Sequence, residues 1–100
     1  MTYITREMFE ERTKGLNAAA NGKIFLESVE GRDEKFVNFL ETLKTDEATH
    51  YYAKNLQLYL YCRIMDWMIE NDFLANRKKD GSRAVLASDI AMMLLLEMKG

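Results

Sequence analysis

Apolar residues concentrate in residues 46–74, which lie in the longest glycine-free run of a chain that has no proline. On a helical wheel, Leu56, Leu60, Ile64 and Trp67 share one face. Further apolar residues flank that face and leave only a narrow polar seam on the opposite side. A helix that is apolar on so much of its circumference is normally buried on several sides. The pattern therefore predicts one long central helix over residues 46–74.

A second apolar run, residues 90–96, contains no polar residue and lies in a helix predicted over residues 82–98. A chain of 100 residues has few other elements with which to surround two such helices. We therefore expect the surplus apolar surface to be buried between subunits, in a homodimer joined through the central and C-terminal helices. The residues predicted at this interface are Tyr59, Tyr61, Met65, Trp67, Met68, Met92 and Leu95.

Residues that favour helix N-caps mark where the helices begin. Thr5 predicts the start of a first helix, and Asp33 predicts the start of another whose apolar residues run to position 43. Thr45 is the expected N-cap of the central helix, and Ser82 or Ser88 is the expected N-cap of the last one. Because little chain separates the helix after Asp33 from the central helix, we expect those two to pack antiparallel.

The dipeptide Asn21-Gly22 is a turn signal that follows three helix-favouring alanines. It predicts a break or a second short helix through Ile24, Phe25, Leu26 and Val29, with a strand in residues 23–29 as the alternative reading. Together these patterns predict an all-α fold: a compact single-domain bundle of four to five helices spanning residues 1–100.

The composition is that of an ordinary globular domain, with 48% hydrophobic residues and a formal net charge of −2. A pI near 5.4 disfavours non-specific binding to nucleic acid or anionic membranes. The single cysteine, Cys62, excludes an intramolecular disulfide and fits a reducing compartment. No signal-peptide pattern is present, and the apolar segment of residues 84–98 is shorter than the roughly 20 residues that span a bilayer. We expect a cytoplasmic protein.

A candidate metal site begins with Glu47 and His50, whose spacing matches the Glu-x-x-His pairs of di-iron helical bundles. Such a site needs a second pair, and the chain contains one histidine. A di-iron site within one subunit is therefore excluded. A symmetric dimer would double the motif, so a small metal-dependent helical protein centred on Glu47 and His50 stays an alternative function. Our main expectation is that the protein binds no cofactor.

Nucleophilic catalysis has little support in this sequence. Cys62 lies in the central helix beside Arg63, and His50 is about 18 Å away along the helix, too far to act as its base. The chain lacks a glycine-rich phosphate loop and any metalloprotease or zinc-binding spacing. We therefore expect no enzymatic activity.

Basic residues cluster in the loop of residues 77–83, whose tip is Asp80-Gly81. Such a loop resembles either the wing of a winged-helix domain or a plain connector. The acidic residues around it favour a solvated connector, and nucleic-acid-binding regulation is kept as an alternative function. The residues predicted to contact nucleic acid in that case are Arg77, Lys78, Lys79 and Arg83.

The most informative signal is the surplus of tyrosine and methionine, two residue types that are common in protein interfaces. Combined with the lack of catalytic motifs, it predicts a small non-enzymatic protein-binding regulator that covers a functional surface of another protein. This description matches small adaptor, antitoxin-like or phage-encoded inhibitor proteins in class. The expected partners are a second copy of the chain and another protein, whose identity the sequence does not give.

Overall fold

The computed structural model describes residues 4–13, 16–77 and 79–99, and these form an all-helical fold without strands. Within these described residues, six α-helices and two short 3-10 helices follow one another. They are α1 (Arg6–Thr13), α2 (Leu16–Glu27), α3 (Glu34–Thr45), α4 (Glu47–Tyr51), η1 (Ala53–Asn55), α5 (Leu56–Glu70), η2 (Ala75–Arg77) and α6 (Ser82–Lys99). The prediction of an all-α fold is confirmed, whereas the expected number of four to five helices was too low.

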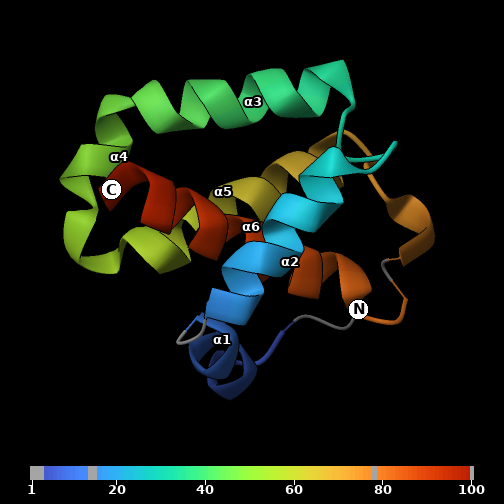
Figure 1. The fold of residues 1–100 in the computed structure, drawn as a ribbon, viewed down its shortest axis with the longest axis horizontal. Helices are drawn as coiled ribbons and strands as arrows, with labels where there is room; N and C mark the ends of the chain where they lie inside the picture. Colours follow the sequence, from blue (N-terminus) through green and yellow to red (C-terminus); the bar gives the residue numbers. More distant parts are fainter. Residues whose placement is uncertain (1–3, 14–15, 78, 100) are drawn as a thin grey trace.

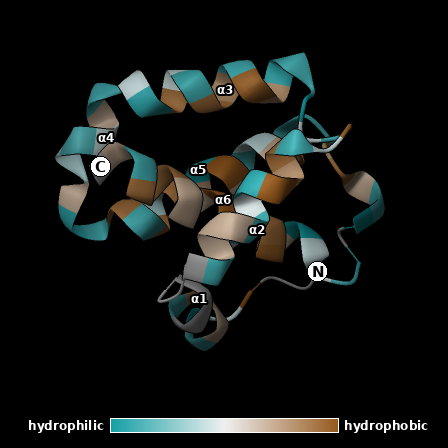
Figure 2. Ribbon diagram, viewed as in Figure 1, coloured by the Kyte–Doolittle hydropathy of each residue, from teal (hydrophilic) through white to brown (hydrophobic). Residues whose placement is uncertain are grey.

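Helix α6 passes through the middle of the molecule, with α3 on one side and α1 on the other (Figure 1). Helices α2 and α5 make the most extensive contacts with it. The hydrophobic residues gather on α5 and α6 in the interior, and the outer edge of α3 is hydrophilic (Figure 2). Every residue from Ile90 to Leu95 is buried within this single chain. Contrary to our expectation, one subunit therefore encloses the apolar run of the last helix as far as Leu95, and Leu96 is half-buried.

Helix α2 continues through Asn21-Gly22, so the predicted break and the alternative strand in residues 23–29 are both wrong. Gly22 faces α6, and a Cβ atom added to it would lie 2.7 Å from the carbonyl oxygen of Asp89. The glycine is thus needed where two helix backbones approach closely, and it does not mark a turn. This close approach lets α2 cover the apolar side of α6.

The predicted central helix is divided into α4 and α5 by the non-helical backbone of Tyr52 and Asn55. Asp46, and not Thr45, is the N-cap of α4: its side chain accepts a hydrogen bond of 2.9 Å from the backbone N–H of Ala48. No glycine or proline marks the division. The available signal was Asn55, a common N-cap residue, which precedes the first of the buried leucines of α5.

Other predicted helix starts agree with the structure. The Thr5 hydroxyl accepts a bond of 3.1 Å from the backbone N–H of Met8, and the Asp33 carboxylate accepts one of 3.0 Å from that of Phe36. Helix α6 begins at Ser82, but Ser82 is its first helical residue and not its N-cap: its backbone N–H donates to the Asp80 side chain at 2.9 Å. Ser88 is buried inside α6 and caps nothing.

Helix α3 packs on α5 and on the turn that follows it through aromatic rings. The Phe39 ring stacks on Trp67 at 5.3 Å between centroids, and Phe36 stacks on Phe73 at 4.7 Å. The two helices run in roughly opposite directions in Figure 1, as expected for a short connection. These contacts hold the C-terminal part of α5 and the turn after it against α3.

Candidate functional site

The α4–α5 corner carries three tyrosines whose rings contact one another in sequence. Tyr51 meets Tyr52 edge-to-face with 5.1 Å between ring centroids, and Tyr52 stacks on Tyr59 at 4.7 Å. Tyr51 is 83% exposed and Tyr52 is 45% exposed, while Tyr59 is half-buried. We call these three residues the tyrosine surface. These contacts place large aromatic side chains next to one another at the outside of the molecule.

Arg63 anchors the inner end of the tyrosine surface. Its Nη1 atom donates to the Tyr59 hydroxyl at 2.6 Å and to Asp46 Oδ2 at 3.2 Å, and its guanidinium lies 5.7 Å from the centre of the Tyr59 ring. The hydrogen bond from Ala48 N–H, followed by that from Arg63, holds the pKa of Asp46 below its usual value. Burial alone would lower the pKa of Arg63, but its bonds to Tyr59 and Asp46 raise that pKa overall. The three tyrosines therefore rest on a charged pair that links α4 to α5.

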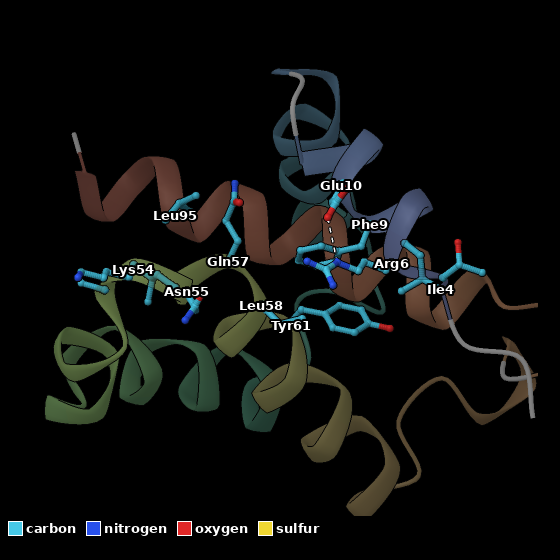
Figure 3. A pocket seen from close by; sticks show the side chains of 13 residues that line it. Ile4, Arg6, Phe9, Glu10, Lys54, Asn55, Gln57, Leu58, Tyr61 and Leu95 are labelled. Carbon is cyan, nitrogen blue, oxygen red and sulfur yellow. Dashed lines mark hydrogen bonds and ion pairs between the residues drawn. The ribbon is translucent and has the colours of Figure 1, made fainter.

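A cleft of about 650 Å³ adjoins the tyrosine surface, between α1 and the beginning of α5 (Figure 3). Ala53, directly after Tyr52, and Leu95 of α6 are both among the residues that line it. We call it the α1–α5 cleft. Its lining consists of Ile4, Thr5, Arg6, Phe9, Glu10, Ala53, Lys54, Asn55, Leu56, Gln57, Leu58, Tyr61 and Leu95.

The α1–α5 cleft has an apolar interior and a charged rim. Phe9 and Tyr61 meet edge-to-face at 5.1 Å and form part of the interior. On the rim, Arg6 Nε pairs with Glu10 Oε1 at 3.1 Å, and Lys54 makes no ion pair with any described residue. An apolar interior with a few polar groups at the edge is the usual character of a binding pocket.

Most residues predicted at a dimer interface lie inside the single chain. Trp67 and Tyr59 are half-buried, and Trp67 is covered by the rings of Phe36, Phe39 and Phe73. The remaining five are buried in the core, namely Tyr61, Met65, Met68, Met92 and Leu95. In this arrangement they contribute to the stability of one subunit. The exposed aromatic surface comes instead from Tyr51 and Tyr52, which the helical pattern alone did not single out.

The basic residues predicted to contact nucleic acid do not form one exposed surface. Arg77 pairs with Glu30 at 2.9 Å, and its guanidinium lies 6.0 Å from the centre of the Phe25 ring. Arg83 is buried and donates to the backbone carbonyl of Phe73 at 3.3 Å. Lys79 is exposed, and Lys78 lies outside the described residues. Arg83 thus stabilises the turn after α5 and cannot reach a phosphate from this position.

The remaining candidate chemical groups are the Glu47 and His50 pair and the Cys62 thiol. Glu47 and His50 are both exposed on α4, and the described part of the chain contains no group of three His, Cys, Asp or Glu side chains placed to hold a metal ion. Burial and the negative charge of Asp66 raise the pKa of the Cys62 thiol. A thiol with a raised pKa stays protonated at neutral pH and is a poor nucleophile.

Comparison with known proteins gave no match to any family model, any curated protein or any solved structure. In the regions that the structure describes, none of the helices combines the length and the apolar character needed to cross a bilayer.

Proposed function

We propose that this chain is a small non-enzymatic protein-binding regulator that covers a functional surface of another protein with its tyrosine surface. The observation that carries the proposal is the exposure of Tyr51 and Tyr52, whose rings contact each other and then Tyr59. Arg63, paired with Asp46, bonds to the hydroxyl of Tyr59. Tyrosine and arginine are the residue types most enriched, with tryptophan, among side chains that dominate binding energy.

The stacking of Tyr52 on Tyr59 favours binding because it leaves the Tyr52 side chain less rotamer freedom to lose. Immobilising a flexible side chain at an interface costs roughly 0.5–1.5 kcal/mol. Tyr52 already stacks on Tyr59, whose hydroxyl is bonded to Arg63, so part of that cost is met during folding. A tyrosine also offers an apolar ring and a polar hydroxyl, which suits a surface that is exposed to water when unbound.

A homodimer is the second form of this proposal, with another copy of the chain as the partner. The tyrosine surface is then the contact, because the methionines first assigned to that role are buried. Sedimentation of the purified protein over a range of concentrations separates the two forms. A dimer that dissociates when Tyr51 and Tyr52 are replaced supports self-association, and a monomer at all concentrations leaves a different protein as the partner.

Capture from a native lysate on the immobilised protein tests the proposal directly. The informative variant is Tyr51→Ser combined with Tyr52→Ser, because both side chains are exposed and their removal leaves the core intact. Val29→Ser is the matched control because Val29 is also an exposed apolar residue, at 90% exposure. Val29 precedes α3 in the chain, and Tyr51 follows α3. Twelve residues of α3 separate the two sites by about 18 Å.

We expect at least one protein to be retained in stoichiometric amount by the wild-type chain and by Val29→Ser, and to be lost from the double tyrosine variant. Retention of the same proteins by all three would contradict a role for the tyrosine surface. Circular dichroism of each variant confirms that the helical fold is unchanged.

A further inference from the structure

The α1–α5 cleft is open at its rim and apolar inside, so it offers a site that the tyrosine surface does not use. Its volume of about 650 Å³ falls in the range of roughly 300–1,000 Å³ that is typical of ligand pockets. Lys54 and Ile4 lie at opposite ends of it, and Phe9, Leu58 and Tyr61 lie between them (Figure 3). The cleft is therefore a groove with room for several apolar side chains.

Charge on the rim is positive, although the whole chain is acidic. Arg6 and Lys54 are the two cations of the lining and Glu10 is its carboxylate, which leaves a formal charge of 2 − 1 = +1. The Arg6 side chain is 91% exposed, so its pair with Glu10 is solvated and weak and leaves Arg6 able to meet a second carboxylate. Because the chain as a whole carries −2, this groove is a local site of attraction for a negatively charged segment.

Residues that line the groove are immediate sequence neighbours of residues in the tyrosine surface. Leu58 is 52% exposed at the lip of the cleft, and the next residue, Tyr59, belongs to the tyrosine surface. Ala53 in the cleft wall likewise follows Tyr52. An occupant that covers both regions exceeds the size of a small ligand, which points to a segment of a protein.

A helix suits this groove better than an extended strand does. An extended peptide leaves its backbone groups unpaired unless it adds to a sheet edge, and the described residues contain no strand. An amphipathic helix satisfies its own backbone hydrogen bonds and presents apolar side chains at the spacing i, i+3, i+4 and i+7.

We propose that the α1–α5 cleft receives one acidic amphipathic helix of the partner protein, with its apolar face on Phe9, Leu58 and Tyr61 and its carboxylates near Arg6 and Lys54. This inference rests on the proposed protein-binding function and adds the chemistry of the segment that is bound. Salt weakens the contact, because carboxylate pairing on an exposed rim is screened by ions.

Selection from a display library of random peptides tests the inference without knowledge of the partner. Peptides of about 16 residues, roughly 24 Å long as a helix, are selected on the folded full-length chain. The variants are Leu58→Asp, which places a like charge in the path of the acidic peptide, and Lys54→Glu, which reverses the rim charge. Val29→Asp is the control because it adds the same charge at an exposed apolar position outside the cleft lining.

We expect the enriched peptides to carry net negative charge and apolar residues at helical spacing. Their affinity should fall at least tenfold for Leu58→Asp and about threefold to tenfold for Lys54→Glu, and change less than twofold for Val29→Asp. Equal enrichment of basic or neutral peptides, or binding that is indifferent to both cleft variants, overturns the inference. Failure of the selection to enrich any peptide overturns it as well.

The failure of this inference is distinguishable from that of the proposed function. Peptides that bind normally to Leu58→Asp but not to the double variant of Tyr51 and Tyr52 overturn the cleft and support the tyrosine surface. Peptides that bind normally to the double variant of Tyr51 and Tyr52 but not to Leu58→Asp support the cleft and overturn the tyrosine surface. A dimer that Leu58→Asp dissociates makes a second copy the occupant and overturns the assignment to a partner helix.

Discussion

Replacing Gly22 with alanine should destabilise the protein, although the same change stabilises most helices. Alanine in a helix interior is normally favoured over glycine by about 0.5–1 kcal/mol. Here the added Cβ atom would lie 2.7 Å from the carbonyl oxygen of Asp89 and 3.1 Å from the backbone nitrogen of Ile90. Both atoms belong to the backbone of α6, so no side-chain rotation relieves the contact.

The two effects have opposite signs, and their sizes decide the outcome. Forcing extra atoms into a packed helix contact typically costs about 1–3 kcal/mol, and here α2 or α6 must shift as a whole. After the helix-propensity gain is subtracted, the free energy of unfolding should fall by about 1–2 kcal/mol. With a urea dependence of about 1–3 kcal/mol per molar, the midpoint should fall by roughly 0.3–2 M.

Urea unfolding followed by circular dichroism measures this change. The control is Asn21→Ala, at the neighbouring exposed position of the same helix, which should raise the free energy of unfolding by about 0.5 kcal/mol. If Gly22→Ala raised the midpoint as Asn21→Ala does, α2 and α6 would not be in backbone contact, and the helix pairing described above would be refuted.

Three further changes test the core, the charged pair and the thiol. Ile64→Ala, at a fully buried position of α5, should lower the free energy of unfolding by about 2–5 kcal/mol in the same urea assay, and a loss below 1 kcal/mol would mean that Ile64 is not enclosed. The lowered pKa of Asp46 means that its carboxylate stabilises the fold above its unfolded pKa of about 4 and loses this effect as the pH falls through the folded-state pKa. The stability difference between wild type and Asp46→Asn should therefore narrow in acid, and a difference independent of pH would contradict the bonds of Asp46 to Ala48 and Arg63. The raised pKa of Cys62 predicts alkylation by iodoacetamide at neutral pH more slowly than that of glutathione, and a faster rate would reveal an activated thiol.

The sequence predicted those elements of the fold that depend on local signals. Thr5 and Asp33 act through side-chain bonds to backbone groups three residues ahead, so their caps are visible in the sequence itself. The break before α5 has no such bond: the side chain of Asn55 makes no cap hydrogen bond, and no glycine or proline lies between α4 and α5. Gly22 was misread for a similar reason, because a glycine at a turn and a glycine at a helix crossing have the same sequence signature.

The candidate site was only partly predictable from the sequence. Abundant tyrosine predicted a binding surface, but which tyrosines are exposed depends on the rotation between α4 and α5. In a single continuous helix, the helical periodicity sets the angle between the Tyr51 and Tyr61 side chains. In the structure, the corner between α4 and α5 sets it instead, and Tyr51 is exposed while Tyr61 is buried. The cleft involves α1, α5 and α6, which are far apart in sequence, and no local pattern signals it.

The affinity of a purified captured partner for the tyrosine variants tests the central claim most directly. Isothermal titration calorimetry compares the wild-type chain with Tyr51→Ser/Tyr52→Ser and with Val29→Ser. Loss of a dominant aromatic contact costs about 2 kcal/mol or more, so the dissociation constant of the double variant should rise by at least about 30-fold. A constant within twofold of wild type for the double variant would contradict the claim that this surface binds the partner.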